Sequence, residues 1–177
     1  MKSVCLVGVR NIFFERTMLK FASDYIYVSE NETRACGLKT GRLLIYDTAA
    51  DFTDIGAMYD GMVFKNDFFS PFDINKRLAR GAFILLSEGC PRAATALEGL
   101  GIRYNVCGLD RSCAVTPSSI SEESVTVSVR NLLAADGRLL LDGEEFRLRG
   151  RFNVYNVCPA MMGGVINRLF ADEGSVP

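Results

Sequence analysis

The chain of 177 residues contains no histidine. This absence excludes Ser-His-Asp triads, Cys-His dyads, histidine zinc sites and imidazole acid–base catalysis. An excess of charge of one sign is also lacking, because 20 Lys and Arg oppose 21 Asp and Glu and leave a formal net charge of −1. Without a basic excess, neither a nucleic acid nor an anionic membrane surface is the expected partner.

Paired cysteine motifs and long hydrophobic runs are lacking as well. The six cysteines include no C-x-x-C pair, and the spacing of Cys107 and Cys113 is not that of a zinc knuckle. A chain of this length does not need disulfides, so free, mostly buried thiols in a reducing cytoplasm are expected, with three disulfides as the alternative. The first apolar run ends at Arg10, and none approaches the roughly 20 residues that span a bilayer. The sequence predicts a soluble, cytoplasmic protein.

Short apolar runs alternate with helical patterns in the first 110 residues. The runs at 4–9, 25–28, 43–46, 62–64, 83–86 and 102–107 show little polar alternation, as expected for parallel strands that helices cover on both faces. Asn11 can cap a helix with Phe14, Met18 and Phe21 at helical spacing, and Pro91 can open a second helix. The pattern predicts a mainly parallel, doubly wound α/β sheet.

The pattern changes in the last third of the chain. Apolar and polar residues alternate over 124–130, and Asp-Gly pairs at 136–137 and 142–143 flank a strand at 138–141, with another at 144–149. These segments predict a small three-stranded antiparallel meander over about 124–149. A C-terminal helix, interrupted by Pro159 and loosened by Gly163 and Gly164, is expected over about 153–170. No repeat or linker is present, so residues 1–177 are expected to form one domain.

Two strand ends are candidate sites for nucleotide or metal. The turn at 7–11 is the nearest candidate for a phosphate loop, but a Walker loop needs several glycines, a Lys and a Ser or Thr, and only Gly8 is present. An ordinary strand-to-helix turn is the favoured interpretation. Asp47, followed by Asp51 and Asp54, lies after the strand at 43–46 and could hold Mg²⁺ through water. Loop solubility explains these acidic residues equally well.

The segment Gly150-Arg-Phe-Asn-Val-Tyr-Asn156 carries the most specific pattern. It closely resembles the strand-to-helix junction of the central domain of the Mur ligases, the ATP-dependent enzymes that add amino acids to peptidoglycan precursors. The resemblance implies that Asn153 and Asn156 contact the adenine of the nucleotide, and amide groups can supply a donor and an acceptor to a base edge. The alternative is that Asn153 is only a helix N-cap.

Other segments extend the resemblance over roughly residues 40–170. Tyr59-Asp-Gly-Met-Val-Phe-Lys-Asn66 is similar to the family's Phe-Asp-x-x-Val-Phe-Thr-Asn segment. Lys76 lies where the family has a lysine that becomes carbamoylated and binds magnesium. The resemblance therefore implies ATP or another adenine nucleotide with Mg²⁺ as cofactor, with Gly8 and Asn66 on the nucleotide side and Lys76 and Asp47 on the metal side.

The departures from the family pattern determine the expected function. The Gly-Lys-Thr/Ser loop is absent, the Asp-His-Leu-Asp segment is replaced by residues 67–73, and the chain has no room for the family's N-terminal and C-terminal domains. Losing the phosphate-loop lysine and magnesium ligands removes transition-state stabilisation from phosphoryl transfer. The leading hypothesis is a degenerate, non-catalytic nucleotide-binding homologue, a pseudoenzyme.

Two further functions remain open. One is an ATP-dependent acid–amino acid ligase that works with separately encoded partner domains. The other is a structural or protein-interaction module, for which an exposed patch of Phe68, Phe69 and Phe72 would indicate a protein partner.

Overall fold

The computed structural model describes residues 1–22, 24–29, 32–37, 43–48, 58–67 and 74–170. The helices are α1 (Ile12–Phe21), the 3₁₀ turn η1 (Ile74–Arg77), α2 (Pro91–Gly99) and α3 (Val157–Phe170). The strands are β1 (Lys2–Val7), β2 (Tyr25–Val28), β3 (Thr33–Ala35), β4 (Leu43–Thr48), β5 (Tyr59–Phe64), β6 (Leu78–Ser87), β7 (Asn105–Cys107), β8 (Val115–Ile120), β9 (Ser124–Val129), β10 (Leu132–Leu133), β11 (Leu139–Leu141) and β12 (Glu144–Arg149).

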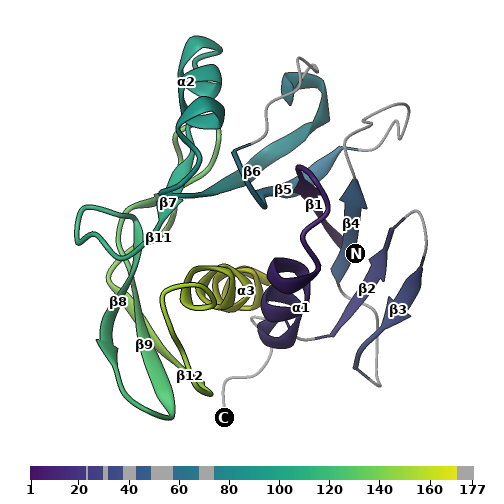
Figure 1. The fold of residues 1–177 in the computed structure, drawn as a ribbon. Helices are drawn as coiled ribbons and strands as arrows, with labels where there is room; N and C mark the ends of the chain where they lie inside the picture. The colour runs from purple at the N-terminus through teal and green to yellow at the C-terminus, as the bar shows by residue number, and fades with distance from the viewer. Residues whose placement is uncertain (23, 30–31, 38–42, 49–57, 68–73, 171–177) are drawn as a thin grey trace, which may run out of the picture.

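One mixed sheet organises the chain (Figure 1). Its strand order is β12-β9-β8-β7-β6-β5-β1-β4-β2-β3. In this order, the consecutive strands β8-β7-β6-β5-β1-β4-β2 pair in parallel. The strand β3 at one end, and β9 and β12 at the other, pair antiparallel. The predicted α/β class with a mainly parallel sheet is confirmed. The edge strands are β12, whose Glu145, Arg147 and Arg149 are exposed, and β3, whose three residues are all exposed.

The helices cover both faces of the sheet, which confirms the doubly wound arrangement. Alternate residues of β1 point to opposite faces, as the pleat of a strand requires. Val4 and Leu6 join the core that α1 and α3 cover, whereas Cys5 and Val7 join the core under α2. In Figure 1 the sheet curves around α1 and α3, and α2 lies on the opposite side.

The antiparallel part differs in pairing from the predicted meander. Strands are present at the predicted positions, but β9 pairs with β8 and β12, while β11 pairs with β10 in a separate two-stranded sheet. The pairing that was expected through 138–141 is therefore wrong. The missed strand is β8, in which Pro117 and Ser119 flank a register shift opposite β9, so its sequence lacks the regular alternation of a strand.

The C-terminal helix α3 is continuous, so the predicted interruption at Pro159 is wrong. Pro159 is the third residue of α3, in the first turn, where a backbone N–H has no partner within the helix. Gly163 allows close packing, because a Cβ there would lie 2.2 Å from the carbonyl oxygen of Met18 in α1. The missing side chain thus lets α1 and α3 approach each other directly.

Two further predictions concern cysteines and membranes. All six cysteines are thiols outside disulfides, and four of them are buried, which confirms the expected unbridged and mostly buried thiols. Within the described ranges, no helix combines the length and the apolar character that crossing a membrane would require.

Candidate functional site

The turn after β1 is held by a side chain that lies just beyond the neighbouring strand β5. Gly8 has a φ of 118°, and a Cβ there would lie 2.5 Å from Oδ1 of Asn66. The Asn66 amide accepts a hydrogen bond from the Val9 N–H at 3.3 Å and donates one to the Val9 carbonyl at 2.9 Å. Gly8 and Asn66 thus lie together, and Asn66 fixes the turn.

The start of α1 is capped by the chain's own polar groups. Asn11 is the N-cap, as predicted, and its Oδ1 accepts a hydrogen bond from the Phe14 N–H at 3.1 Å. The Asn11 N–H donates to Oε1 of Glu15 at 2.8 Å. A carboxylate in the first turn is also favoured by the positive end of the helix dipole. Two backbone N–H groups at the start of the helix, those of Asn11 and Phe14, are thus bonded to the protein's own side chains.

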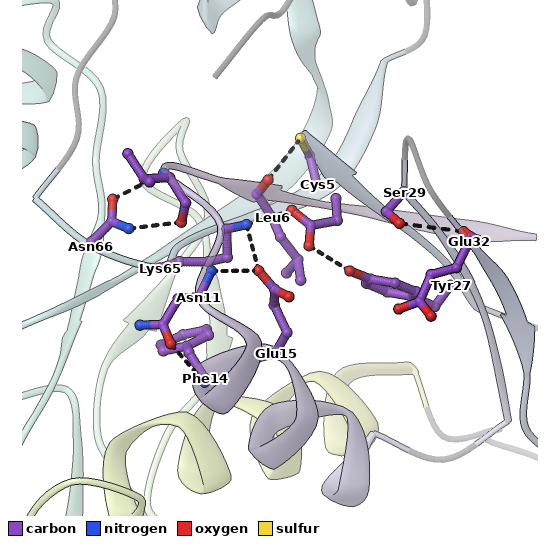
Figure 2. Close-up of polar contacts among 12 residues, drawn as sticks. Cys5, Leu6, Asn11, Phe14, Glu15, Tyr27, Ser29, Glu32, Lys65 and Asn66 are labelled. Atoms are coloured by element: carbon purple, nitrogen blue, oxygen red, sulfur yellow. Dashed lines mark hydrogen bonds and ion pairs between the residues drawn. The ribbon is translucent and has the colours of Figure 1, made fainter. Parts of the chain in front are cut away.

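A buried cluster of charges lies directly behind this cap (Figure 2). The Lys65 side chain, just beyond β5, is fully buried, and its Nζ lies 2.9 Å from Oε1 of Glu15 and 2.5 Å from Oδ1 of Asp47. The other Asp47 oxygen accepts a 2.5 Å hydrogen bond from the hydroxyl of Tyr27 in β2. The cluster joins α1, β2, β4 and β5 at the carboxyl edge of the parallel strands.

Two carboxylates in the cluster share one ammonium group. Burial raises the pKa of Asp47, although the bonds from Lys65 and Tyr27 act against this rise. Burial acts in the same direction on Glu15, but the hydrogen bonds from Lys65 and from the Asn11 N–H outweigh it and lower the pKa of this carboxyl. Burial and the bond to Asp47 raise the pKa of Tyr27, which therefore remains a neutral donor. The cluster is internally satisfied and links the strands.

The two residues expected to bind metal do not lie together. Asp47 is in the carboxyl half of β4, where it is opposite Leu6 of β1, which is in turn opposite Val63 of β5. The exposed Lys76 lies in η1, before the amino end of β6. Because β4 and β6 run parallel, Asp47 lies near the carboxyl ends of the parallel strands and Lys76 lies near their amino ends. Both Asp47 oxygens are also engaged, so they do not fit a direct magnesium site.

The other candidates for a metal site are limited. Asp51 and Asp54 lie outside the described residues. The residues considered for a protein-binding patch, Phe68, Phe69 and Phe72, lie outside them as well. Across the described ranges, no three Cys, Asp or Glu side chains gather in a way that could hold a metal ion.

The predicted adenine residues lie in the turn that leads into α3. Asn153 Oδ1 accepts hydrogen bonds from the N–H groups of Tyr155 at 2.9 Å and Asn156 at 3.1 Å, which is the behaviour of a cap. Oδ1 of Asn156 accepts from the Asn153 N–H at 2.7 Å, and its Nδ2 donates to the Arg151 carbonyl at 3.1 Å. The Oδ1 of Asn156 can accept one further hydrogen bond, and its Nδ2 can donate one more.

A hollow of about 260 Å³ opens between this turn and α1. Its lining residues come from both elements: Arg16, Thr17, Lys20, Phe21, Gly150, Arg151, Phe152 and Asn156. The rings of Phe21 and Phe152 lie 5.7 Å apart between centroids, and Nζ of Lys20 lies 5.5 Å from the centre of the Phe21 ring. Asn156, but not Asn153, is thus placed beside the helix that follows β1.

Comparison with known proteins was informative only at the level of structure. No protein-family model matches the chain. No curated protein matches it by sequence either. Among solved structures, the crystal structure of a murein peptide ligase, Mpl, from Psychrobacter arcticus matches with a TM-score of 0.59. The fold is Mur ligase-like.

The likeness is distant and partial. The two chains are 11% identical, and the match covers 96% of this chain and 44% of the ligase. This chain therefore spans less than half the length of the ligase. At this identity the likeness establishes the arrangement of strands and helices and leaves the roles of individual residues as predictions.

Sequence reasoning missed three members of the buried cluster, Lys65, Glu15 and Tyr27. The sequence does contain one indication that Lys65 belongs to the cluster. Lys65 directly follows a predicted strand, as Asp47 also does. The carboxyl ends of parallel strands meet at one edge, so the two were candidates for a contact. The contribution of Glu15 and Tyr27 depends on how α1 and β2 pack, which local patterns do not specify.

Proposed function

We propose that this chain is a Mur ligase-like domain that binds an adenine nucleotide without using it for amide ligation. The observation that carries the proposal is the Glu15 carboxylate, which accepts hydrogen bonds from the Asn11 N–H and from Lys65. A triphosphate at the start of a helix needs free N–H groups and a cation. Here the N–H group of Asn11 and the Lys65 ammonium are both bonded to the protein's own Glu15 carboxylate.

The nucleotide half of the proposal rests on Asn156. Its amide lines the hollow and retains one donor and one acceptor, which suits the edge of a purine base. The Mur ligase-like fold agrees with a nucleotide of this kind, and the resemblance of residues 150–156 implies adenine. The cytoplasm, where adenine nucleotides are abundant and thiols stay reduced, is the proposed location.

Two measurements on the purified chain test the proposal. Calorimetric titration with ATP, with and without Mg²⁺, reports nucleotide binding, and release of ADP or phosphate reports turnover. We expect binding that Mg²⁺ does not strengthen and no turnover. Micromolar binding that depends on Mg²⁺ would overturn the degenerate half, and the absence of any adenine binding would overturn the nucleotide half.

A matched pair of variants connects the binding to the hollow. Asn156→Asp removes the amide donor but keeps the oxygen that accepts from Asn153, so it should weaken binding about tenfold. Asn75→Asp makes the same chemical change at an exposed position outside the hollow and should leave binding unchanged.

The alternative of a ligase with separately encoded partner domains is favoured by one observation. The match leaves more than half of the murein peptide ligase without a counterpart in this chain. Under this alternative, a separately encoded protein supplies the phosphate-binding loop. Turnover of ATP that appears only when a co-purifying protein is added back would support this alternative over a non-catalytic role.

A further inference from the structure

We infer that the hollow between α1 and the turn at 150–156 takes a nucleoside monophosphate, with the phosphate bound beside the base. This inference rests on the proposed function and narrows its ligand. A base and a single phosphate group need an aromatic surface and a cluster of cations within one small site, and the hollow provides both.

Positive charge is concentrated at the hollow. Arg16, Lys20 and Arg151 line it, and no Asp or Glu among the described residues does. In the described part of the chain, none of these three cations forms an ion pair with a carboxylate, although the protein as a whole has a net charge of −1. Three cations that no described carboxylate neutralises raise the local concentration of an anion and bind a phosphate through charge-assisted hydrogen bonds.

Aromatic surface lies in the same place. Phe21 and Phe152 are both half-buried, and their rings meet at an interplanar angle of 38° on the wall of the hollow. A purine can stack on such a wall, and an Arg guanidinium can cover the opposite face of the base. Inorganic phosphate alone would leave this apolar surface unused.

The ligand is limited to one phosphate by its surroundings. At about 260 Å³ the hollow lies just below the usual range for small-molecule sites, roughly 300–1,000 Å³. Toward the start of α1, the backbone N–H groups of Asn11 and Phe14 are already bonded to Glu15 and Asn11, so they are not available to additional phosphates. In the part of the chain that the structure describes, no carboxylate lines the hollow to hold the Mg²⁺ that accompanies ATP.

Titration of the full chain with AMP, adenosine, ribose 5-phosphate and ATP with Mg²⁺ tests the inference. We expect AMP to bind about tenfold more tightly than adenosine or ribose 5-phosphate, and at least as tightly as ATP with Mg²⁺. Arg151→Gln should weaken AMP binding about tenfold and leave adenosine binding unchanged. Arg149→Gln removes the same charge from an exposed position outside the hollow and should change neither.

The outcomes separate this inference from the proposed function. Equal affinity for adenosine and AMP would overturn the phosphate contact and leave the proposed function standing. Equal affinity for ribose 5-phosphate and AMP would overturn the base contact. Tighter binding of ATP with Mg²⁺ than of AMP would overturn both the inference and the degenerate site. If none of the four binds, the inference fails together with the nucleotide half of the proposed function.

Discussion

Replacement of Lys65 by Met tests whether the buried cluster stabilises the fold. Lys65→Met keeps most of the side-chain volume and removes the ammonium group that Glu15 and Asp47 share. The Lys65 side chain is fully buried, and its two partners are 6% and 4% exposed. Two carboxylates would then remain in a nearly dry environment without a counter-charge, because Tyr27 and the Asn11 N–H supply only neutral hydrogen bonds.

The expected loss follows from the burial. Removing one partner of a buried ion pair typically costs about 3–5 kcal/mol. This is a large part of the roughly 5–15 kcal/mol that stabilises a single domain. For a chain of this length, the loss corresponds to a decrease in Tm on the order of 10 °C.

The loss should depend on pH in a definite direction. In the variant, the buried carboxylates have pKa values above those of the unfolded chain, so they destabilise the fold at high pH and less as pH falls and they take up protons. In the wild type, the lowered pKa of Glu15 gives stability that is present above the ordinary value of 4.5 and is lost as pH falls through the folded value. The difference between the two proteins should therefore be larger at pH 7.5 than at pH 5.

Urea unfolding followed by far-ultraviolet circular dichroism suits this measurement, since the chain contains no Trp. A variant that combines Lys65→Met with Glu15→Gln and Asp47→Asn is the control, because replacing a whole buried ion pair by neutral groups is often nearly neutral. A loss below about 1 kcal/mol at pH 7.5, or an equal loss at pH 5, would refute the reasoning. Failure of the control to recover stability would refute it too.

Three other predictions test packing, a buried amide and thiol reactivity. Gly163→Ala should cost about 1–3 kcal/mol because its Cβ would meet the Met18 carbonyl, whereas Gly99→Ala, with nothing within 4 Å, should be neutral or stabilising by up to about 1 kcal/mol. Equal effects in urea unfolding would argue against close packing of α1 and α3. Asn105→Leu should cost about 1–3 kcal/mol, since the buried amide donates to the Ile84 and Leu133 carbonyls and accepts from the Leu133 N–H; an unchanged melting curve would contradict this. Burial and the neighbouring Glu88 raise the pKa of Cys113 to about 12, so iodoacetamide at pH 8 should label the exposed Cys36 first. Peptide mass spectrometry checks the order, and equal rates would contradict it.

Local patterns predicted the position of most elements because burial determines their composition. The strands at 25–28 and 144–149 have the predicted bounds, and Asn11 and Pro91 mark the helix starts as expected. β1 carries apolar residues on both faces, which is why it was recognised as a covered parallel strand.

Pairing and the candidate site were less predictable. The alternation of 124–129 predicts a half-exposed strand, which is wrong, because every residue of β9 except Thr126 is buried. The alternation also does not identify the neighbouring strands, and without β8 the next strand in sequence was the expected partner. The Lys65 cluster joins residues 18 and 50 positions away in the chain, so no local pattern contains it. Asn153 and Asn156 were recognised as a pair, yet their hydrogen bonds to the turn depend on backbone geometry that the residue types alone do not reveal.

The two ends of the sheet have different consequences for self-association. Another chain that added to β12 would have to draw water away from Glu145, Arg147 and Arg149, which lie exposed along that strand. Charged side chains of this kind keep edge strands from joining. At the other end, β3 carries a single charged residue, Arg34, between Thr33 and Ala35. Charged side chains therefore oppose unwanted growth of the sheet from copy to copy more strongly at β12 than at β3.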